Sequence, residues 1–103
     1  MTTLLKLGIL GSTNGTDLQA IIDSINQKRL YASVEVVISN TSNAYILERA
    51  TSQNIPNYFI SHLSKTREQF DDEISTLLKK YKVDLVLLIG FMRILSTKFC
   101  KEW

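Results

Sequence analysis

The residue types best suited to bind an anion lie in one short loop, residues 11–17, with the sequence Gly-Ser-Thr-Asn-Gly-Thr-Asp. The loop follows an apolar run and precedes apolar residues at helical spacing, so it connects a strand to a helix. Free backbone N–H groups at such a junction, together with the positive end of the helix dipole, favour an anion, most often phosphate. The loop lacks the lysine of the P-loop and the G-x-G-x-x-G spacing. A plain turn whose glycines supply positive φ therefore explains the spacing equally well.

A second candidate for ligand binding is Arg93, which stands between Met92 and the apolar pair Ile94 and Leu95. It comes directly after a continuous apolar segment. A polar side chain at the rim of an apolar pocket is typical of a cofactor site, although an ordinary surface arginine also fits this position. Arg67, near the start of a later helix pattern, is a similar candidate. Because a cation in the first turn opposes the helix dipole, Arg67 needs a partner or is solvated.

The remaining titratable residues give weaker indications of chemistry. His62 lies near Ser61 and Ser64, so a pair of base and nucleophile is conceivable, but a solvated loop histidine is the commoner case. Cys100 and His62 lie far apart in the chain without the paired spacing of a metal site, so no metal is expected. The acidic run at 71–73 is interpreted as the solvated face of a helix and not as an acid/base pair, because Asp71 and Asp72 would point about 100° apart on a helix.

The composition is that of a single folded domain. The 103 residues are 45% hydrophobic and 21% charged, with a net charge of +2. This charge is too small to indicate a nucleic acid or an acidic membrane surface, and no apolar run approaches the ~20 residues of a membrane span. One cysteine cannot form an internal disulfide, which is consistent with a reducing cytoplasm. We therefore expect a cytoplasmic protein that binds small molecules and neither nucleic acid nor membrane.

Hydrophobic patterning predicts strands that alternate with helices. The predicted strands are 4–10, 34–38, 57–60 and 84–90, and the predicted helices are 17–28, 44–53 and 66–81, with 91–99 leading into a fourth helix. Two S/T-x-x-E/Q spacings, Thr16 with Gln19 and Thr66 with Gln69, predict capping boxes at helix starts.

This alternation implies an α/β, Rossmann-like parallel sheet with flanking helices. Such sheets bind ligands at their carboxyl edge where the strand order reverses, so residues 11–17, 39–43 and 90–93 should meet there. The strand at 84–90 is continuously apolar, which is typical of a central strand covered on both faces. If nothing covers it, it is an apolar edge through which the chain could pair as a homodimer.

Four segments stand in an order and at spacings that resemble one family. They are Gly-Ser-Thr-Asn-Gly-Thr-Asp-Leu-Gln-Ala-Ile-Ile at 11–22, Ile-Ser-Asn at 38–40, Leu-Glu-Arg-Ala at 47–50 and Gly-Phe-Met-Arg-Ile-Leu-Ser at 90–96. Together they closely resemble the N-terminal half of the phosphoribosylglycinamide formyltransferases, and the resemblance covers the whole chain. The related deformylase and the tRNA formyltransferases share the fold but generally differ in the first and last segments.

The resemblance implies a formyltransferase fold, of which residues 1–103 would be the N-terminal, nucleotide-binding half. It implies transfer of a formyl group from the cosubstrate 10-formyltetrahydrofolate to the amino group of glycinamide ribonucleotide, in de novo purine (IMP) biosynthesis. By motif position, the ribonucleotide phosphate would be bound by Gly15, Thr16 and Asp17. The positions implied for the formyl-folate are Arg67, Met92, Arg93, Ile94 and Leu95.

Two departures from the family pattern limit these implications. Asp17 stands where the family commonly has asparagine, and a carboxylate that faced a phosphate at about 4 Å would repel it by ~1–4 kcal/mol. We therefore predict that Asp17 offers its backbone N–H while its carboxylate turns away. The catalytic Asn-x-His-Pro segment and the later aspartate of the family have no counterpart in these 103 residues. The chain is expected to lack the catalytic C-terminal half, to contain no catalytic residue and to be inactive alone.

Two other interpretations stay open at this point. The chain could be a non-catalytic module, or a truncated remnant, that binds a nucleotide or a folate. It could also complete its sheet by dimerising through the strand at 84–90.

Overall fold

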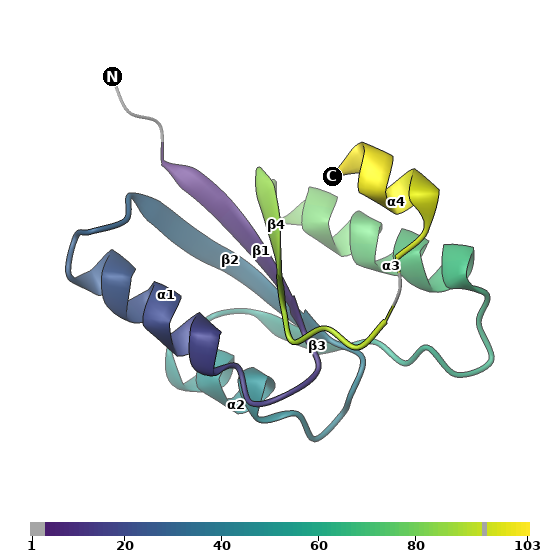
Figure 1. Ribbon diagram of the computed structural model, residues 1–103, viewed down its shortest axis with the longest axis horizontal. Coiled ribbons are helices and arrows are strands. Elements are labelled where there is room, and N and C mark those ends of the chain that lie inside the picture. Colours follow the sequence, from purple (N-terminus) through teal and green to yellow (C-terminus); the bar gives the residue numbers. More distant parts are fainter. Residues whose placement is uncertain (1–3, 94) are drawn as a thin grey trace.

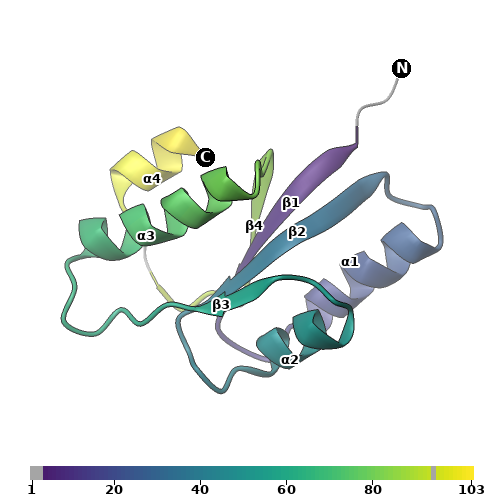
Figure 2. The same cartoon turned by 180° about the vertical axis from the view of Figure 1, so that it is seen from behind.

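The computed structural model describes residues 4–93 and 95–103, in which strands and helices alternate along the chain (Figure 1). The elements are β1 (Leu5–Gly11), α1 (Thr16–Asn26), β2 (Ala32–Ser39), α2 (Tyr45–Ser52), β3 (Asn57–Phe59), α3 (Arg67–Lys80), β4 (Leu85–Ile89) and α4 (Thr97–Glu102). Helices α1 and α2 cover one face of the sheet, and α3 and α4 lie on the other (Figures 1 and 2). The predicted alternation is confirmed, with small differences at the element ends.

The strands form one parallel sheet in the order β3-β2-β1-β4. β1 pairs with β2 on one side and with β4 on the other, so that Leu7 lies opposite both Val34 and Leu85. The chain therefore builds outward from β1 to β3 and then returns to the far side of β1. The strand order reverses between β1 and β4, as in a Rossmann-like fold, and this confirms the predicted fold class.

Alternate residues of the central strands face two separate apolar layers, because successive side chains of a strand point to opposite faces. The layer under α1 and α2 contains Leu7, Ile9, Leu18, Ile22 and Val37. The layer under α3 contains Leu10, Val36, Ile38, Phe70, Ile74 and Leu78. The helical stripes predicted for α1 and α3 thus face the core.

One prediction about the sheet is wrong. Within the described residues β4 lies at the edge of the sheet, and β1 and β2 occupy its centre. Leu85 and Leu88 of β4 are 40% and 56% exposed. In the described chain, the apolar sequence of β4 therefore does not mean that both faces of this strand are buried. Pairing of two copies through this edge stays a prediction.

The two predicted capping boxes have different outcomes. At α3 the box is formed: Gln69 N–H donates to Thr66 Oγ1 at 3.1 Å, and Thr66 N–H donates to Gln69 Oε1 at 2.9 Å. At α1 the prediction is wrong, because the N-cap is Gly15 with φ of 71°, and no side chain caps the helix. Thr16 is the first residue of α1, and the side chain of Gln19 instead donates to Asp23 at 3.1 Å.

None of the helices in the described part of the chain combines the length and the apolar character needed to cross a membrane.

Candidate functional site

Three loops meet at the carboxyl edge of the sheet, next to the point where the strand order reverses. Ser12 N–H donates to the Gly90 carbonyl at 3.2 Å, which joins the loop after β1 to the end of β4. Ile46 N–H donates to the Thr13 carbonyl at 3.1 Å, which joins the same loop to α2. Ser12 also bonds to Asn40 of the 39–43 stretch, so the predicted convergence of residues 11–17, 39–43 and 90–93 is confirmed.

Ser12 is the polar centre of this meeting point. Its side chain is 8% exposed, donates to Asn40 Oδ1 at 2.5 Å, and accepts a bond from Met92 N–H at 2.9 Å. The amide nitrogen of Asn40 lies 3.4 Å from His62 Nδ1, which accepts in this pair. A polar chain thus connects the ends of three strands with the loop after β3.

Sequence reasoning did not assign Ser12 and Asn40 a role in this network. Each is a polar residue that directly follows a buried strand, Ser12 after β1 and Asn40 after β2. That position is the signal in the sequence that could have identified them. The interpretation of His62 as a solvated loop residue is also incomplete. His62 is half-buried and meets the Phe70 ring edge-on, with the ring centres 6.2 Å apart.

The predicted phosphate loop ends in a helix start that no side chain caps. The first intrahelical bond of α1 is from Gln19 N–H to the Gly15 carbonyl, at 3.1 Å. The N–H groups of Thr16, Asp17 and Leu18 therefore have no carbonyl one turn earlier in the helix. Gly15 is buried, whereas Thr16 and Asp17 are exposed. The arrangement leaves donors next to the positive end of the α1 dipole, where an anion is stabilised.

The second group of predicted residues lies around Phe70 of α3. The Phe91 ring stacks on the Phe70 ring, with centres 6.4 Å apart and planes inclined by 6°. The Arg93 guanidinium carbon lies 5.5 Å from the centre of the Phe70 ring, and the buried Arg93 Nε has no partner among the described residues. Arg67 is exposed and three residues before Phe70, so the two are neighbours on the helix surface.

The other residues predicted to contact the folate do not share the same surroundings in the structure. Met92 is 73% exposed and held through its backbone by Ser12. Leu95 is half-buried, on the side of β4 that faces α4. Ile94 lies outside the described residues.

The interpretation of the acidic run at 71–73 as a solvated face is wrong for its first member. Asp71 is 2% exposed, and its Oδ2 accepts a bond from Ser96 N–H at 2.6 Å. Its other oxygen has no partner among the described residues. Asp72 and Glu73 are exposed, as predicted. The cause is the segment before α4, which covers this side of α3 and is invisible in the periodicity of α3 itself.

α4 is held against α3 by a polar cluster at its end. The Ser75 hydroxyl donates to Glu102, and Trp103 Nε1 donates to Ser75 Oγ at 3.1 Å. Lys79 Nζ lies 2.9 Å from a Glu102 oxygen. The hydrogen bond from Ser75, followed by the contact with Lys79, lowers the pKa of Glu102 below its ordinary value. This cluster joins the C-terminal end of α4 to α3.

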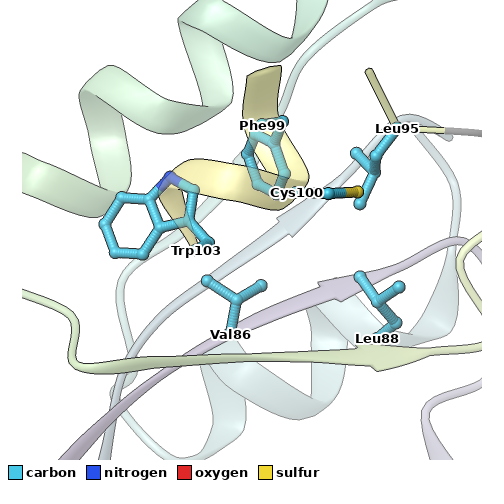
Figure 3. A pocket seen from close by; sticks show the side chains of 6 residues that line it. All are labelled: Val86, Leu88, Leu95, Phe99, Cys100 and Trp103. Atoms are coloured by element: carbon cyan, nitrogen blue, oxygen red, sulfur yellow. The ribbon is translucent and has the colours of Figure 1, made fainter. Parts of the chain in front are cut away.

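An apolar groove of about 190 Å³ lies between β4 and α4. Figure 3 shows Val86 and Leu88 of β4 facing the side chains of α4 across it. The full lining is Val86, Leu88, Leu95, Phe99, Cys100 and Trp103. Pockets for small molecules are usually about 300–1,000 Å³, so this groove alone is too small for a folate. In the part of the chain that the structure describes, no cluster of three or more His, Cys, Asp or Glu could hold a metal ion.

Comparison with known proteins places this geometry in a family. Residues 5–103 match the model of the formyl transferase family. The chain is 37% identical over 100 residues to the phosphoribosylglycinamide formyltransferase of Escherichia coli, and the match covers 96% of this chain and 47% of that protein. It is 39% identical over 99 residues to the human trifunctional purine biosynthetic protein adenosine-3, covering 95% of this chain and 10% of that protein.

The structural comparison agrees. The phosphoribosylglycinamide formyltransferase of Coxiella burnetii superposes with a TM-score of 0.91 at 39% identity, covering 97% of this chain and 47% of that one. The chain thus spans about half the length of the single-function relatives and a tenth of the human protein. Because the family model covers nearly the whole chain and the fold agrees with it, the chain belongs to the formyl transferase family.

Proposed function

We propose that this chain takes part in formyl transfer from 10-formyltetrahydrofolate to the amino group of glycinamide ribonucleotide, within de novo purine biosynthesis. The family match and the names of the relatives support this reaction class. The structural observation that carries the proposal is the uncapped start of α1 at Gly15. It presents free amide donors beside the meeting point of the loops at the carboxyl edge.

In this proposal the phosphate of the ribonucleotide binds to the backbone N–H groups of Gly15, Thr16 and Asp17. A left-handed N-cap and a helix without a side-chain cap leave these donors available for an anion. Asp17 contributes its N–H, and its exposed carboxylate turns to solvent because it would otherwise repel the phosphate. Affinity for the ribonucleotide then depends on the backbone of the loop more than on its side chains.

The cosubstrate fits the chemistry of the second group of residues. A reduced folate combines a flat heterocycle with an anionic tail, and the chain offers apolar surface at Met92 and Leu95 with the cations Arg67 and Arg93 nearby in the fold. Ile94, which stands between Arg93 and Leu95 in the sequence, completes the proposed contact set. The folate supplies the transferable formyl group. The role of the residues of this chain is to bind and orient both substrates.

None of these 103 residues supplies an Asn-x-His pair for acid–base catalysis and oxyanion stabilisation. We therefore expect the 103-residue chain to bind ribonucleotide without sustained turnover. Isothermal titration of the chain with glycinamide ribonucleotide, and with the same riboside lacking the phosphate, tests the phosphate site. The proposal requires tighter binding of the phosphorylated compound. Equal affinity for both would contradict it, and steady formylation by the chain alone would contradict the expected inactivity.

A further inference from the structure

The segment Leu-Glu-Arg-Ala at 47–50 is one of the four that carry the family resemblance, and the proposed reaction gives it no role. Its arginine, Arg49, lies on α2 and points at the loop after β1. Arg49 Nε donates to the Asn14 carbonyl at 2.6 Å. The guanidinium carbon also lies 4.8 Å from the centre of the Tyr45 ring, one helical turn earlier, which holds the side chain in place.

A second bond from α2 reaches the preceding peptide of the same loop. Ile46 N–H donates to the Thr13 carbonyl at 3.1 Å. Two consecutive carbonyls, those of Thr13 and Asn14, thus point toward α2. In a trans peptide the carbonyl and the following N–H point in opposite directions, and none of the described peptide bonds is cis. The N–H groups of Asn14 and Gly15 therefore point away from α2.

The loop after β1 also packs closely against α2 at Gly15. Gly15 has φ of +71°, and a Cβ built on it would lie 2.5 Å from Ile46 Cγ1. Gly15 therefore packs closely against α2, and the Arg49 bond opposes rotation of the Asn14–Gly15 peptide. Contacts with α2 thus determine which side of the loop presents backbone N–H groups and which side presents backbone carbonyl groups.

We infer that Arg49 is a positioning residue for phosphate binding. By holding the Asn14 carbonyl, its Nε–H turns the Gly15 N–H toward the anion and keeps the acceptor oxygen away from it. This inference rests on the proposed function, because it assigns Arg49 to the same phosphate loop. Arg49 acts through the peptide that it orients, so the hydrogen bond matters and the net charge of the side chain is secondary.

Two substitutions separate the hydrogen bond from the charge. In Arg49→Gln the amide nitrogen occupies the same position along the side chain as Nε, so the donor is kept and the charge is lost. In Arg49→Met a methyl group takes that position, so the donor is lost as well. Titration with glycinamide ribonucleotide should show a loss of affinity of about fivefold or more for Arg49→Met, as expected for the loss of one ordinary hydrogen bond. Arg49→Gln should keep most of the affinity.

The phosphate-free riboside supplies a readout that a purely structural role would not produce. Both variants should bind it as the unsubstituted chain does, so only the preference for the phosphorylated compound falls in Arg49→Met. Arg29→Met makes the same change at an exposed arginine that follows the C-terminal end of α1, away from Gly15, and should leave both affinities unchanged. Thermal unfolding followed by circular dichroism checks that each variant is folded.

The outcomes distinguish this inference from the proposed function. If the unsubstituted chain shows no preference for the phosphorylated compound, the proposed phosphate site itself fails. If it shows the preference and Arg49→Met keeps it, only the role of Arg49 is overturned. An equal loss in Arg49→Gln and Arg49→Met would also overturn it, because the charge of the side chain would then be the cause.

Discussion

The hydroxyl of Ser12, just beyond the end of β1, accepts a hydrogen bond from the backbone N–H of Met92, which lies 80 residues later in the chain. This bond joins the loop proposed to hold the ribonucleotide phosphate to the segment proposed to contact the folate. The same hydroxyl donates to Asn40 at 2.5 Å, so Ser12 fixes three strand ends relative to one another. The two proposed binding segments are therefore held at one fixed separation by a buried side chain.

Replacing Ser12 tests this connection. Ser12→Ala leaves the Met92 N–H and Asn40 Oδ1 without their partner, at a residue that is 8% exposed. We expect the free energy of unfolding to fall by about 1–3 kcal/mol, the usual cost of an unsatisfied buried polar group. Chemical unfolding in urea measures it. Ser42→Ala, at an exposed turn position, is the matched control and should change stability by less than about 0.5 kcal/mol.

Gly15 and Gly90 form a natural pair for testing how tightly the loop is packed. Both have positive φ, 71° and 59°, so alanine is strained at either position. A Cβ at Gly15 would meet Ile46 Cγ1, Cβ and Cα within 2.5–3.1 Å, whereas at Gly90 the close contact is Thr13 Oγ1 at 2.6 Å, with the other Thr13 atoms beyond 3.6 Å. A threonine side chain can rotate, but the first turn of α2 cannot move as easily.

We therefore expect Gly15→Ala to destabilise the chain more than Gly90→Ala. The backbone strain, about 1 kcal/mol or more, is common to both variants, and the additional loss in Gly15→Ala measures the contact with α2. Thermal unfolding of the two variants side by side gives the difference. Equal losses would mean that the loop can move away from Ile46, and that α2 does not constrain it.

The elements that were predictable from sequence are those whose signal is local. The hydrophobic spacing that predicted the helix at 66–81 and the Thr66–Gln69 box both belong to one short segment, α3 with its N-cap, and both predictions are confirmed. The α1 start was mispredicted because the same spacing at Thr16 does not reveal that the glycine before it takes the cap position.

The parts of the site that escaped prediction depend on distant segments. Asp71 is buried because the segment around Ser96, 25 residues later, covers it. Ser12 joins two loops because the backbone N–H of Met92, 80 residues later, donates to its hydroxyl. The edge position of β4 depends on strand order, which the hydrophobicity of one strand does not encode. The convergence of the loops, in contrast, followed from the α/β topology alone, since parallel strands bring their carboxyl ends to one edge.

The burial of Asp71 gives a prediction about the segment that leads to α4. Asp71→Ala removes the acceptor of the Ser96 N–H, and leaving this buried donor without a partner should cost about 1–3 kcal/mol of stability. Asp71→Asn keeps an oxygen that can accept this bond, so it should recover part of the loss. The neighbouring Asp72 is exposed, and its Oδ1 lies 3.4 Å from Lys98 Nζ. Asp72→Ala should therefore lower the free energy of unfolding by less than about 1 kcal/mol. Urea unfolding of the three variants tests this order.

Glu102 gives a prediction about pH. The Ser75 hydroxyl and Lys79 lower the pKa of Glu102 below its ordinary value of 4.5, so the folded chain favours the charged form more than the unfolded chain does. Its contribution to stability is therefore present above pH 4.5 and is lost as the pH falls through the lowered pKa. In Glu102→Gln the midpoint of thermal unfolding should fall less steeply across this acid range. Glu48→Gln, an exposed residue of α2, should keep the steeper fall. Parallel slopes in all three proteins would show that the Ser75 and Lys79 contacts do not act in solution.

Asp17 tests where the side chains of the proposed phosphate loop point. Asp17 is exposed in the first turn of α1, where a carboxylate is favoured by the helix dipole and is free to turn to solvent. If it does so, Asp17→Asn should change the affinity for glycinamide ribonucleotide by less than about threefold, because the backbone N–H is unchanged and a distant exposed charge is screened by salt. Titration at low and at moderate salt measures this. Asp23→Asn, two turns further along α1, is the control for the change in net charge. A gain of about tenfold or more in Asp17→Asn alone would show that the carboxylate faces the phosphate, since about 1.4 kcal/mol of repulsion would have been removed.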